Sequence, residues 1–265
     1  MKQILDPELP ARDFRIAASG HEADLAGANR VTNIFCENAL EMALQLREKA
    51  ESAEITVLSV GPESVTDTLR KALAMKADRA VRVDAALATP VDSRGLAQVL
   101  AAAVESLGGF DVILLGRESG DWGLGQSGAC LAEVLGVPLV SFVDEITLVA
   151  SKESPLHLCR QTDEGWERFA SSTPVVVTVT NSDDNLPRIP KTRDIMKSSR
   201  LPMTTLTLEE LGLAEEVVNP STPGCRVVGL EIPAPKTDCD FVTGDSLDEQ
   251  VSELAERVAE IVRKV

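Results

Sequence analysis

The sequence predicts an α/β fold, a doubly wound and mostly parallel sheet of the adenine-nucleotide-binding type, with a loop-rich C-terminal arm that ends in a helix. Short apolar runs alternate with amphipathic helical patterns, a glycine-dense turn joins one run to a helix, and the alternation ends near residue 180. Continuous apolar strands that alternate with helices are typical of parallel sheets covered on both faces. At 265 residues the chain is long enough to bury a substantial core.

Five runs of leucine and β-branched residues are predicted to be strands, because short apolar runs bounded by turn residues are typical of buried strands. They are residues 55–60, 80–83, 112–116, 139–143 and 175–180. Apolar residues at helical spacing predict helices between these runs. The helical patterns run from Phe35 to Leu46, from Leu69 to Ala74 and from Ser93 to Leu107.

The chain beyond residue 180 has a different composition. A polar segment at 181–200 leads into a loop-rich region punctuated by prolines, and the chain ends in one amphipathic helix. Ser246 and Glu249 form a capping box at the start of this helix. Its apolar residues recur every three or four positions, at Leu247, Val251, Leu254, Val258, Ile261 and Val265. Such a helix packs either on its own domain or on a second subunit.

Composition excludes several classes of protein. A formal charge of -16 would repel nucleic acid and anionic lipid, and no apolar run approaches the roughly 18 residues of a membrane span. The five scattered cysteines are typical of free thiols in a reducing compartment, and they form no metal-ligand spacing with His21 or His157. The N-terminus shows no secretory signal pattern. We therefore expect a cytoplasmic protein, or a mitochondrial matrix protein if the source is eukaryotic.

Residues 114–128 join an apolar strand to a helix through a glycine-dense turn. With few Cβ atoms in the way, backbone N–H groups can approach an anion, and the N-terminus of the next helix favours negative charge. We therefore expect a nucleotide to bind here. The residues expected to bind the nucleotide are glycines and polar residues of this turn: Gly116, Arg117, Asp121, Gly123, Gly125, Gln126 and Ser127.

Alternatives remain for several of these residues. Asp121 could instead form an Asx-turn or cap a helix. Arg117 could instead be a surface residue in an ion pair. Residues 123–128 match the G-x-G-x-x-G fingerprint of nicotinamide dehydrogenases, with Asp144 where the ribose-binding acid would stand. The match is weak, because six residues separate Gly116 at the strand end from the first glycine of the fingerprint. No serine here has a histidine partner in local sequence, so nucleophilic catalysis is not indicated.

Two further segments are expected to face the same crevice. Asn33, Ile34, Phe35 and Cys36 precede a helix, where Asn33 is either the N-cap or presents its backbone to a base or a phosphate. Val60 ends a predicted strand just before a turn. Ligands of doubly wound sheets collect at the carboxyl ends of strands, so both segments are predicted to lie beside the glycine-dense turn.

Several motifs, in the same order, resemble the electron transfer flavoprotein beta subunit over roughly residues 2–203. Motifs that occur together in register are more specific than a single glycine pattern. They are NIFCENALE at 33–41, SVGP at 59–62, KALAMKADRA at 71–80, LLGR at 114–117, QSG at 126–128, TPVVVTV at 173–179, NLPR at 185–188 and DIMK at 194–197.

The resemblance implies an electron carrier subunit with no catalytic acid, base or nucleophile of its own. An alpha subunit would hold most of the redox FAD, and this subunit would bind AMP, or a second FAD in an electron-bifurcating member. By the same resemblance, the nucleotide site comprises Asn33, Ile34, Phe35, Cys36, Val60 and residues 116–127. Electrons would arrive from acyl-CoA dehydrogenase-type flavoenzymes and leave to a quinone reductase or another acceptor.

The resemblance also predicts how the chain is divided. Residues 1–203 would form the nucleotide-binding domain, with a recognition loop for the electron donor at about 180–202. Residues 204–265 would be an arm whose helix clasps the alpha subunit. The sequence departs from the family pattern at Thr192 and Arg193, where many members have leucine and proline as an apolar anchor.

Two other features distinguish this chain. The predicted recognition loop is basic within an acidic protein, through Lys191, Arg193, Lys197 and Arg200, which favours either an acidic docking surface or a solvated loop. Family members usually begin with an apolar strand ahead of the segment that starts here at Lys2. We expect such a strand before Met1, because loss of an inner strand would leave unpaired backbone groups on its neighbour.

One alternative keeps the fold and changes the function. A non-redox adenine-nucleotide sensor or scaffold on the same fold is compatible with the sequence, because fold does not fix function. Such a protein would bind AMP or ATP without a reducible chromophore. The flavoprotein interpretation predicts a yellow heterodimer with the alpha subunit instead.

Overall fold

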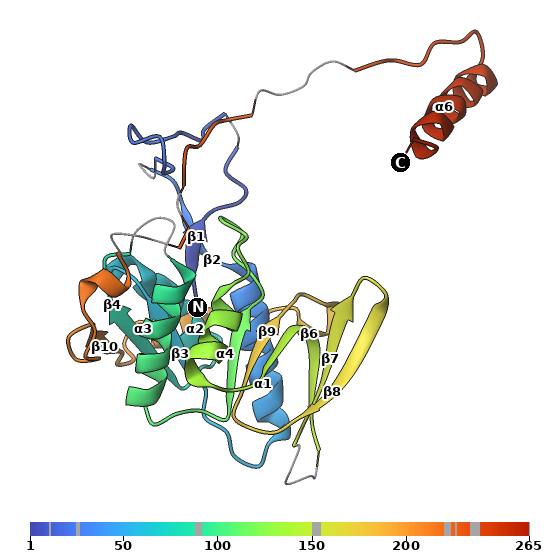
Figure 1. The fold of residues 1–265 in the computed structure, drawn as a ribbon. Helices are drawn as coiled ribbons and strands as arrows, with labels where there is room; N and C mark the ends of the chain where they lie inside the picture. Colours follow the sequence, from blue (N-terminus) through green and yellow to red (C-terminus); the bar gives the residue numbers. More distant parts are fainter. Residues whose placement is uncertain are drawn as a thin grey trace. The chain divides into compact units, whose positions relative to one another are not determined.

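The computed structural model describes residues 1–10, 12–24, 27–87, 92–149, 155–219, 224–225, 227–233 and 239–264. The chain divides into two compact units, Met1–Leu230 and Glu231–Val265. The first unit contains the sheets and the helices that cover them, and the second contains helix α6 (Figure 1). No helix within the described ranges is long and apolar enough to cross a membrane.

The smaller main sheet is parallel throughout, with strand order β10-β4-β3. Its strands are β3 (Thr56–Val60), β4 (Arg79–Asp84) and β10 (Thr204–Thr207). Beyond β10, Leu208 and Val218 are buried in the cluster that contains Val83 of β4. Residues just past 203 therefore contribute a strand and core side chains to the first unit, while the predicted role of 204–265 as an arm on the alpha subunit stays a prediction.

The larger sheet has strand order β5-β9-β6-β7-β8. Strands β5, β9 and β6 are parallel, whereas β6, β7 and β8 form an antiparallel meander. The bounds are Val112–Gly116 for β5, Leu139–Leu148 for β6, Leu156–Thr162 for β7, Gly165–Ser171 for β8 and Val175–Val179 for β9. The prediction of a mostly parallel α/β fold is confirmed, although the β7–β8 hairpin was not predicted and β6 is longer than expected.

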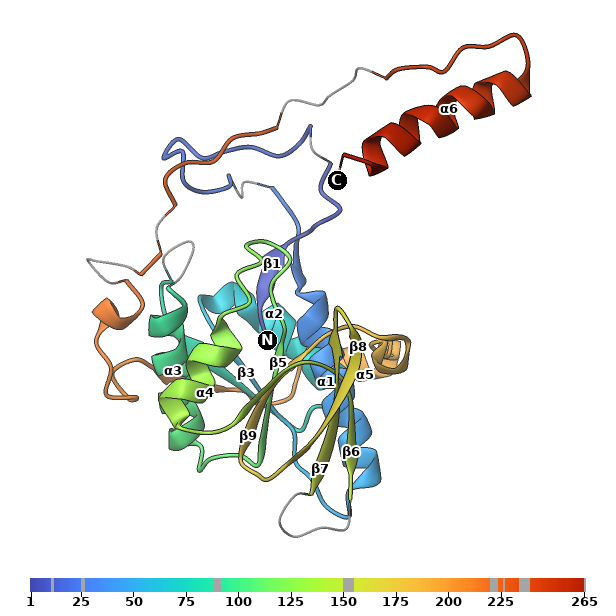
Figure 2. The ribbon, with the colours of Figure 1, turned by 45° about the vertical axis from the view of Figure 1, so that its right-hand side comes forward.

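Helices cover both faces of the larger sheet (Figure 2). Alternate residues of a strand point to opposite faces. Val175, Val177 and Val179 pack in the cluster that includes residues of α1, whereas Val176 packs with residues of α3 and α4. The helices are α1 (Ile34–Lys49), α2 (Thr66–Ala74), α3 (Ser93–Ser106), α4 (Ser127–Leu135) and α5 (Thr192–Ser198), with short 3-10 turns η1 (Glu63–Val65), η2 (Asp183–Asn185) and η3 (Glu215–Val217).

The start of the chain leads into α1 through a small antiparallel pair. Strand β1 (Gln3–Leu5) pairs with β2 (Arg30–Thr32), and Asn33 follows directly as the N-cap residue of α1. Ile4 is buried in this pair. The pair therefore brings the first residues of the chain beside the N-terminus of α1.

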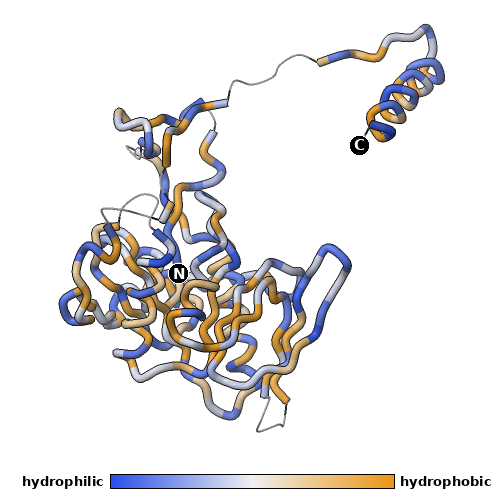
Figure 3. The backbone as a smooth tube through the Cα atoms, in the orientation of Figure 1, coloured by the Kyte–Doolittle hydropathy of each residue, from blue (hydrophilic) through white to orange (hydrophobic). Residues whose placement is uncertain are grey.

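The second unit is dominated by α6 (Leu247–Val262). The Ser246 hydroxyl accepts from the backbone N–H of Glu249, and the Glu249 carboxylate accepts from that of Asp245, one residue earlier than in the predicted reciprocal box. Within this unit the large apolar residues of α6 are exposed, and Figure 3 shows hydrophobic and hydrophilic stretches alternating along the helix. Val265, the last residue of the predicted apolar repeat, lies outside the described residues.

Candidate functional site

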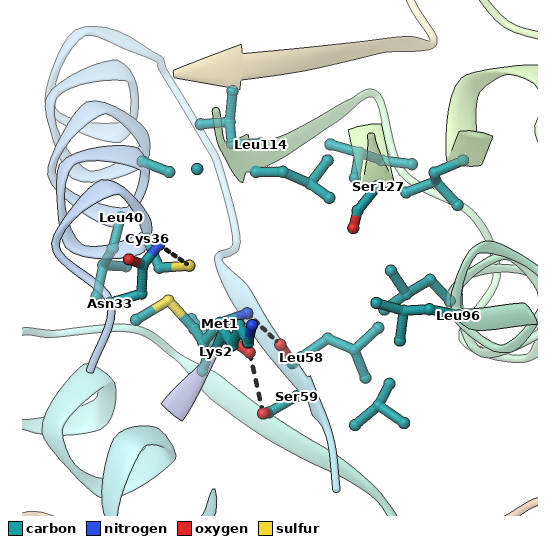
Figure 4. A pocket seen from close by; sticks show the side chains of 18 of the residues that line it. Met1, Lys2, Asn33, Cys36, Leu40, Leu58, Ser59, Leu96, Leu114 and Ser127 are labelled. Atoms are coloured by element: carbon teal, nitrogen blue, oxygen red, sulfur yellow. Dashed lines mark hydrogen bonds between the residues drawn. The ribbon is translucent and has the colours of Figure 1, made fainter. Parts of the chain in front are cut away.

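A cavity of about 330 Å³ lies between β3 and β5 and reaches their carboxyl ends. Both strands line it along their lengths, and residues of α1 and α3 line it as well. Figure 4 shows Leu58, Leu96 and Leu114 around the apolar part, and Asn33, Cys36 and Ser127 beside it. The cavity thus has an apolar length between the strands and a more polar end where the strands finish.

The structure brings much of the predicted site together at this polar end. Predicted residues that line the cavity are Asn33, Cys36, Val60, Gly116, Arg117, Gly125 and Ser127. The other predicted residues belong to the same segments but do not line it: Ile34, Phe35, Asp121, Gly123 and Gln126. Sequence reasoning did not single out Met1 and Lys2, which also line the cavity, because nothing local relates them to residues more than thirty positions away.

Asn33 connects the two main segments of the site. It is the N-cap residue of α1, but its side chain makes no capping hydrogen bond. Instead its Nδ2 donates to the backbone oxygen of Glu118 at 2.8 Å, and its Oδ1 accepts from the N–H of Gly120 at 3.0 Å. Since Asn33 is almost fully buried, these bonds hold the glycine-dense turn against the start of α1.

Two glycines fit this turn for different reasons. A Cβ on Gly116 would lie 2.7 Å from the backbone carbon of Phe35 and 2.9 Å from the nitrogen of Cys36, so only glycine allows β5 to end this close to α1. Gly125 has a φ of +62°, a left-handed conformation that side chains disfavour. Both positions keep the backbone of the turn close to the cavity.

The N-termini of two helices meet at the cavity. Cys36 lies in the first turn of α1, and Ser127 is the first residue of α4. The unsatisfied N–H groups and the dipole of a helix N-terminus favour an anion. This end of the cavity therefore suits a phosphate, while the leucines between the strands do not.

Arg117 is held by aromatic rings and by a carboxylate. Its guanidinium lies 4.5 Å from the centroid of the Phe35 ring and 5.6 Å from that of Phe142. It also pairs with Glu118 at 2.9 Å and donates to the Thr180 hydroxyl at 3.1 Å. Phe35 therefore packs on Arg117, and the arginine charge is paired within the protein.

Asp121 is engaged by the start of the chain. Lys2 Nζ lies 2.7 Å from its Oδ1, and the same oxygen accepts from the N–H of Trp122 at 2.8 Å. Burial acts to raise the pKa of Asp121, but the hydrogen bonds from Lys2 and Ser119 and the charge of Lys2 outweigh it and lower the pKa below 3.8. Asp121 therefore stays ionised and fixes the tip of the turn to residue 2.

Comparison with known proteins identifies the family. The family model for the electron transfer flavoprotein domain matches residues 24–211, most of the chain. A relative from Mycobacterium tuberculosis, named electron transfer flavoprotein subunit beta, is 34% identical over 228 residues, 84% of each chain. The chain belongs to the electron transfer flavoprotein family, as a beta subunit. The predicted family is thereby confirmed.

Two further relatives extend this comparison. An electron transfer flavoprotein subunit beta from Megasphaera elsdenii is 31% identical and covers 76% of this chain and 73% of its own length. Subunit CarD of the caffeyl-CoA reductase-Etf complex from Acetobacterium woodii is 27% identical over 234 residues, 88% of this chain and of that subunit. Family membership implies electron transport that involves a flavin, and an alpha subunit as partner.

In this beta subunit, residues 180–202 follow β9 and correspond to the predicted recognition loop. Asn185 is buried and ties the loop to the sheet and to α1. Its Oδ1 accepts from the N–H of Ser182 at 2.9 Å and from Asn38 Nδ2 at 3.1 Å. Its own Nδ2 donates to the backbone oxygen of Thr180 at 2.8 Å. The first part of the loop is therefore fixed.

Arg188 attaches the loop to α1 at a second point. Two of its nitrogens lie 2.8 Å from the two carboxylate oxygens of the buried Glu41, and a third lies 2.9 Å from Glu48. Burial acts to raise the pKa of Glu41, but the hydrogen bonds and charge of Arg188 outweigh it, so this pKa is lowered. The bidentate geometry gives the contact a defined orientation.

The end of the loop is attached to α2. Asp194 of α5 pairs at 2.6 Å with Lys76, just beyond the C-terminus of α2. Arg70 donates to the backbone oxygens of Ser198 at 2.6 Å and Leu201 at 2.5 Å, at the C-terminal end of α5. Helix α5 is thus held at both of its ends.

The outer side of the loop is apolar and basic. Ile189 is 91% exposed and Met196 is 67% exposed. Four basic residues of the loop are exposed as well: Lys191, Arg193, Lys197 and Arg200. The loop therefore presents exposed apolar and cationic groups from a firmly attached backbone.

Proposed function

We propose that this beta subunit binds AMP as a structural nucleotide at the polar end of the β3–β5 cavity, in a cytoplasmic heterodimer that carries electrons. The supporting observation is the convergence of the glycine-dense turn and of the N-termini of α1 and α4 on one cavity. A phosphate at that end would be favoured by both helix dipoles.

The residues at this end fit an adenine nucleotide. Backbone N–H groups near Gly125 and Ser127 can approach a phosphate, and the half-buried Trp122 and Val60 supply apolar walls for a base. Phosphate recognition would rest on the backbone and on the helix dipoles. Trp122 makes the turn bulky, which favours AMP over a second FAD.

The alpha subunit would hold most of the redox FAD, which accepts and donates the electrons. The apolar residues of α6 support this partnership. Leu247, Val251, Leu254 and Val258 lie on one side of the helix and are each about half exposed or more within their own unit. An amphipathic helix of this kind suits a hydrophobic surface on a second subunit.

Residues 180–202 are proposed to dock an acyl-CoA dehydrogenase-type donor, and a quinone reductase or another acceptor would receive the electrons. Thr192 and Arg193, which replace the usual apolar anchor, are both exposed. Ile189, three residues before Thr192, is the most exposed large apolar residue of the loop. We assign the anchor role to Ile189 in this chain, with the surrounding basic residues favouring an acidic donor surface.

The decisive experiment is to co-purify the chain with its alpha subunit, denature the heterodimer and quantify the nucleotides that are released. One FAD and one AMP per heterodimer is the expected result. Two FAD and no AMP would overturn the AMP assignment and favour an electron-bifurcating complex. A colourless heterodimer that holds AMP or ATP would contradict electron transfer and favour a non-redox nucleotide-binding module.

A further inference from the structure

Helix α2 ends at a residue whose backbone is strained. Its C-cap residue is Met75, and the next residue, Lys76, has a φ of +90°. The Lys76 N–H donates to the backbone oxygen of Leu73 at 3.1 Å. The Ala77 N–H donates to that of Ala72 at 3.1 Å. These two bonds form a Schellman motif, whose left-handed position is usually glycine because a Cβ is disfavoured there. A lysine at this position therefore costs free energy that a glycine would not.

The side chain of Lys76 makes a contact that glycine could not make. Its Nζ lies 2.6 Å from Oδ1 of Asp194, whose side chain is only 9% exposed. The Nε of Arg193 lies 3.9 Å from the same oxygen, which is too far for a hydrogen bond. A carboxylate with so little access to water needs a cation beside it. Lys76 therefore supplies the close cation for Asp194.

Helix α5 is too short to hold its position alone. It has seven residues, and isolated helices shorter than about 12 residues are marginal in water. Asp194 lies in its first turn. At its other end, Arg70 donates to the backbone oxygens of Ser198 and Leu201. Since Arg70 belongs to α2 and Lys76 follows it directly, two cations from one helix hold α5 at opposite ends.

This attachment fixes which side chains of α5 face outward. Asp194 and Ser198 are four residues apart, lie on one side of the helix and are buried. Between them, Ile195 is 51% exposed and Met196 is 67% exposed. A surface that is already ordered binds a partner with a smaller loss of conformational entropy. The contacts with α2 therefore prepare an apolar part of residues 180–202 for docking.

We propose that Lys76 is a positioning residue for docking of the electron donor, which rests on the docking role proposed for residues 180–202. The left-handed backbone at the end of α2 places its ammonium group on Asp194. That ion pair holds α5 so that Ile195 and Met196 are presented to the donor. Strain at the end of α2 is thus retained because it orders a surface that functions elsewhere.

The first test compares three variants of the heterodimer with wild type. Lys76→Gly removes both the strain and the ammonium group. The midpoint of urea unfolding is expected to rise, because left-handed strain costs more than a half-exposed ion pair contributes. Amide hydrogen exchange in α5 is nevertheless expected to become about fivefold faster. Unchanged exchange in α5, or a lower urea midpoint, would overturn the proposal.

The other two variants isolate the charge of Lys76. Lys76→Arg keeps a cation at this position, and exchange in α5 is expected to stay near that of wild type. Lys49→Gln removes the charge of an exposed lysine at the end of α1 and is expected to leave α5 unchanged. Faster exchange in α5 with either of these variants, equal to that of Lys76→Gly, would overturn the role of the ion pair.

The second test measures electron transfer from a purified butyryl-CoA dehydrogenase supplied with butyryl-CoA. With Lys76→Gly, the KM for the heterodimer is expected to rise about threefold while kcat is unchanged, because docking is altered and the flavin is not. A lower kcat with an unchanged KM would overturn the positioning role.

Ile189→Ser in the same assay separates this inference from the proposed function. A KM that changes with Ile189→Ser but not with Lys76→Gly would overturn the role of Lys76 alone. A KM that changes with neither variant would overturn the docking role of residues 180–202, and the role of Lys76 with it.

Discussion

Two loops leave neighbouring parallel strands and are built in opposite ways. Gly116 at the end of β5 pairs with Val179 at the end of β9. The loop after β5, residues 116–126, contributes to a cavity. Hydrogen bonds from Asn33 hold it in place, and its glycines allow its backbone to approach the cavity closely. The loop after β9, residues 180–202, is held by Asn185 and Arg188 and turns Ile189 outward. A loop that approaches a ligand needs an unobstructed backbone, whereas a loop that presents side chains needs strong attachments.

The largest effect on stability is expected from Asn185→Ala. This change removes the side-chain partner of the N–H of Ser182 and of the buried backbone oxygen of Thr180, whereas Asn38 keeps its bond to the backbone oxygen of residue 185. The free energy of unfolding in urea should fall by about 2–3 kcal/mol. Asn181→Ala, at an exposed asparagine of the same loop, should change it by less than about 0.5 kcal/mol. Equal effects would show that the loop is not held as described.

The next effect concerns Arg188→Met, which leaves the buried Glu41 without its ion pair. The free energy of unfolding near neutral pH should fall by about 2 kcal/mol. Because Arg188 lowers the pKa of Glu41 below 4.5, the stability from this pair is full above that pH and is lost as the pH falls through the lowered pKa. The difference between the two proteins should therefore shrink on acidification, as measured by urea unfolding at several pH values.

The matched control is Arg193→Met, since the Arg193 side chain is 85% exposed. It should change the free energy of unfolding by less than about 0.5 kcal/mol at any of these pH values. A difference between wild type and Arg188→Met that stays constant from neutral to acidic pH would contradict the role of the Glu41 charge.

A smaller effect on stability is expected in the cavity loop. Gly125→Ala places a Cβ on a residue with φ of +62°, 3.5 Å from the Arg117 backbone oxygen, and should cost about 1 kcal/mol. Gly136→Ala, at the C-cap of α4 with φ of +63° and open space around it, provides the same backbone strain away from the cavity. Only Gly125→Ala should weaken AMP retention by the heterodimer, by about tenfold. Equal AMP retention by the two variants would contradict the placement of the nucleotide.

The smallest effect on stability is expected from Ile189→Ser on the outer side of the recognition loop. Because Ile189 is 91% exposed, unfolding should shift by less than about 0.5 kcal/mol. The rate of electron transfer from an acyl-CoA dehydrogenase-type donor should nevertheless fall, in stopped-flow measurements of flavin reduction. Val228→Ser, at an 83% exposed residue outside this loop, is the control. An unchanged rate with Ile189→Ser would remove Ile189 as the anchor.

The clearest of the strands that sequence patterns predicted is β9, which is buried on both faces. All five residues of β9 are buried valines or a threonine, so a short apolar run was sufficient evidence. The β7–β8 hairpin was not predicted because β8 lacks an apolar pattern. Its residues 166–170 are exposed, and two of them, Glu167 and Arg168, are charged. Its pairing with β7 depends on backbone hydrogen bonds, which leave little trace in composition.

The candidate site, too, could be predicted only in part from the sequence. The glycine-dense turn and its likeness to one family were visible in the sequence, and the placement of AMP there stays a prediction. The contact of Lys2 with Asp121 joins residues 119 positions apart, and no local pattern relates them. Asn33 was expected as an N-cap or as a residue that presents its backbone to a ligand. It is the N-cap residue of α1, its ligand role stays a prediction, and its side chain holds the turn.

The sequence by itself determined the alternation of strands and helices, the glycine-dense turn and the family, because periodicity, backbone freedom and motif order are properties of neighbouring residues. Only the tertiary structure decided that β3 and β5 border one cavity, that Arg188 pairs with Glu41 and that the Ile189 side chain is exposed to solvent. Those facts depend on which distant segments meet, and on the water that each contact excludes, so they arise only when the whole chain packs.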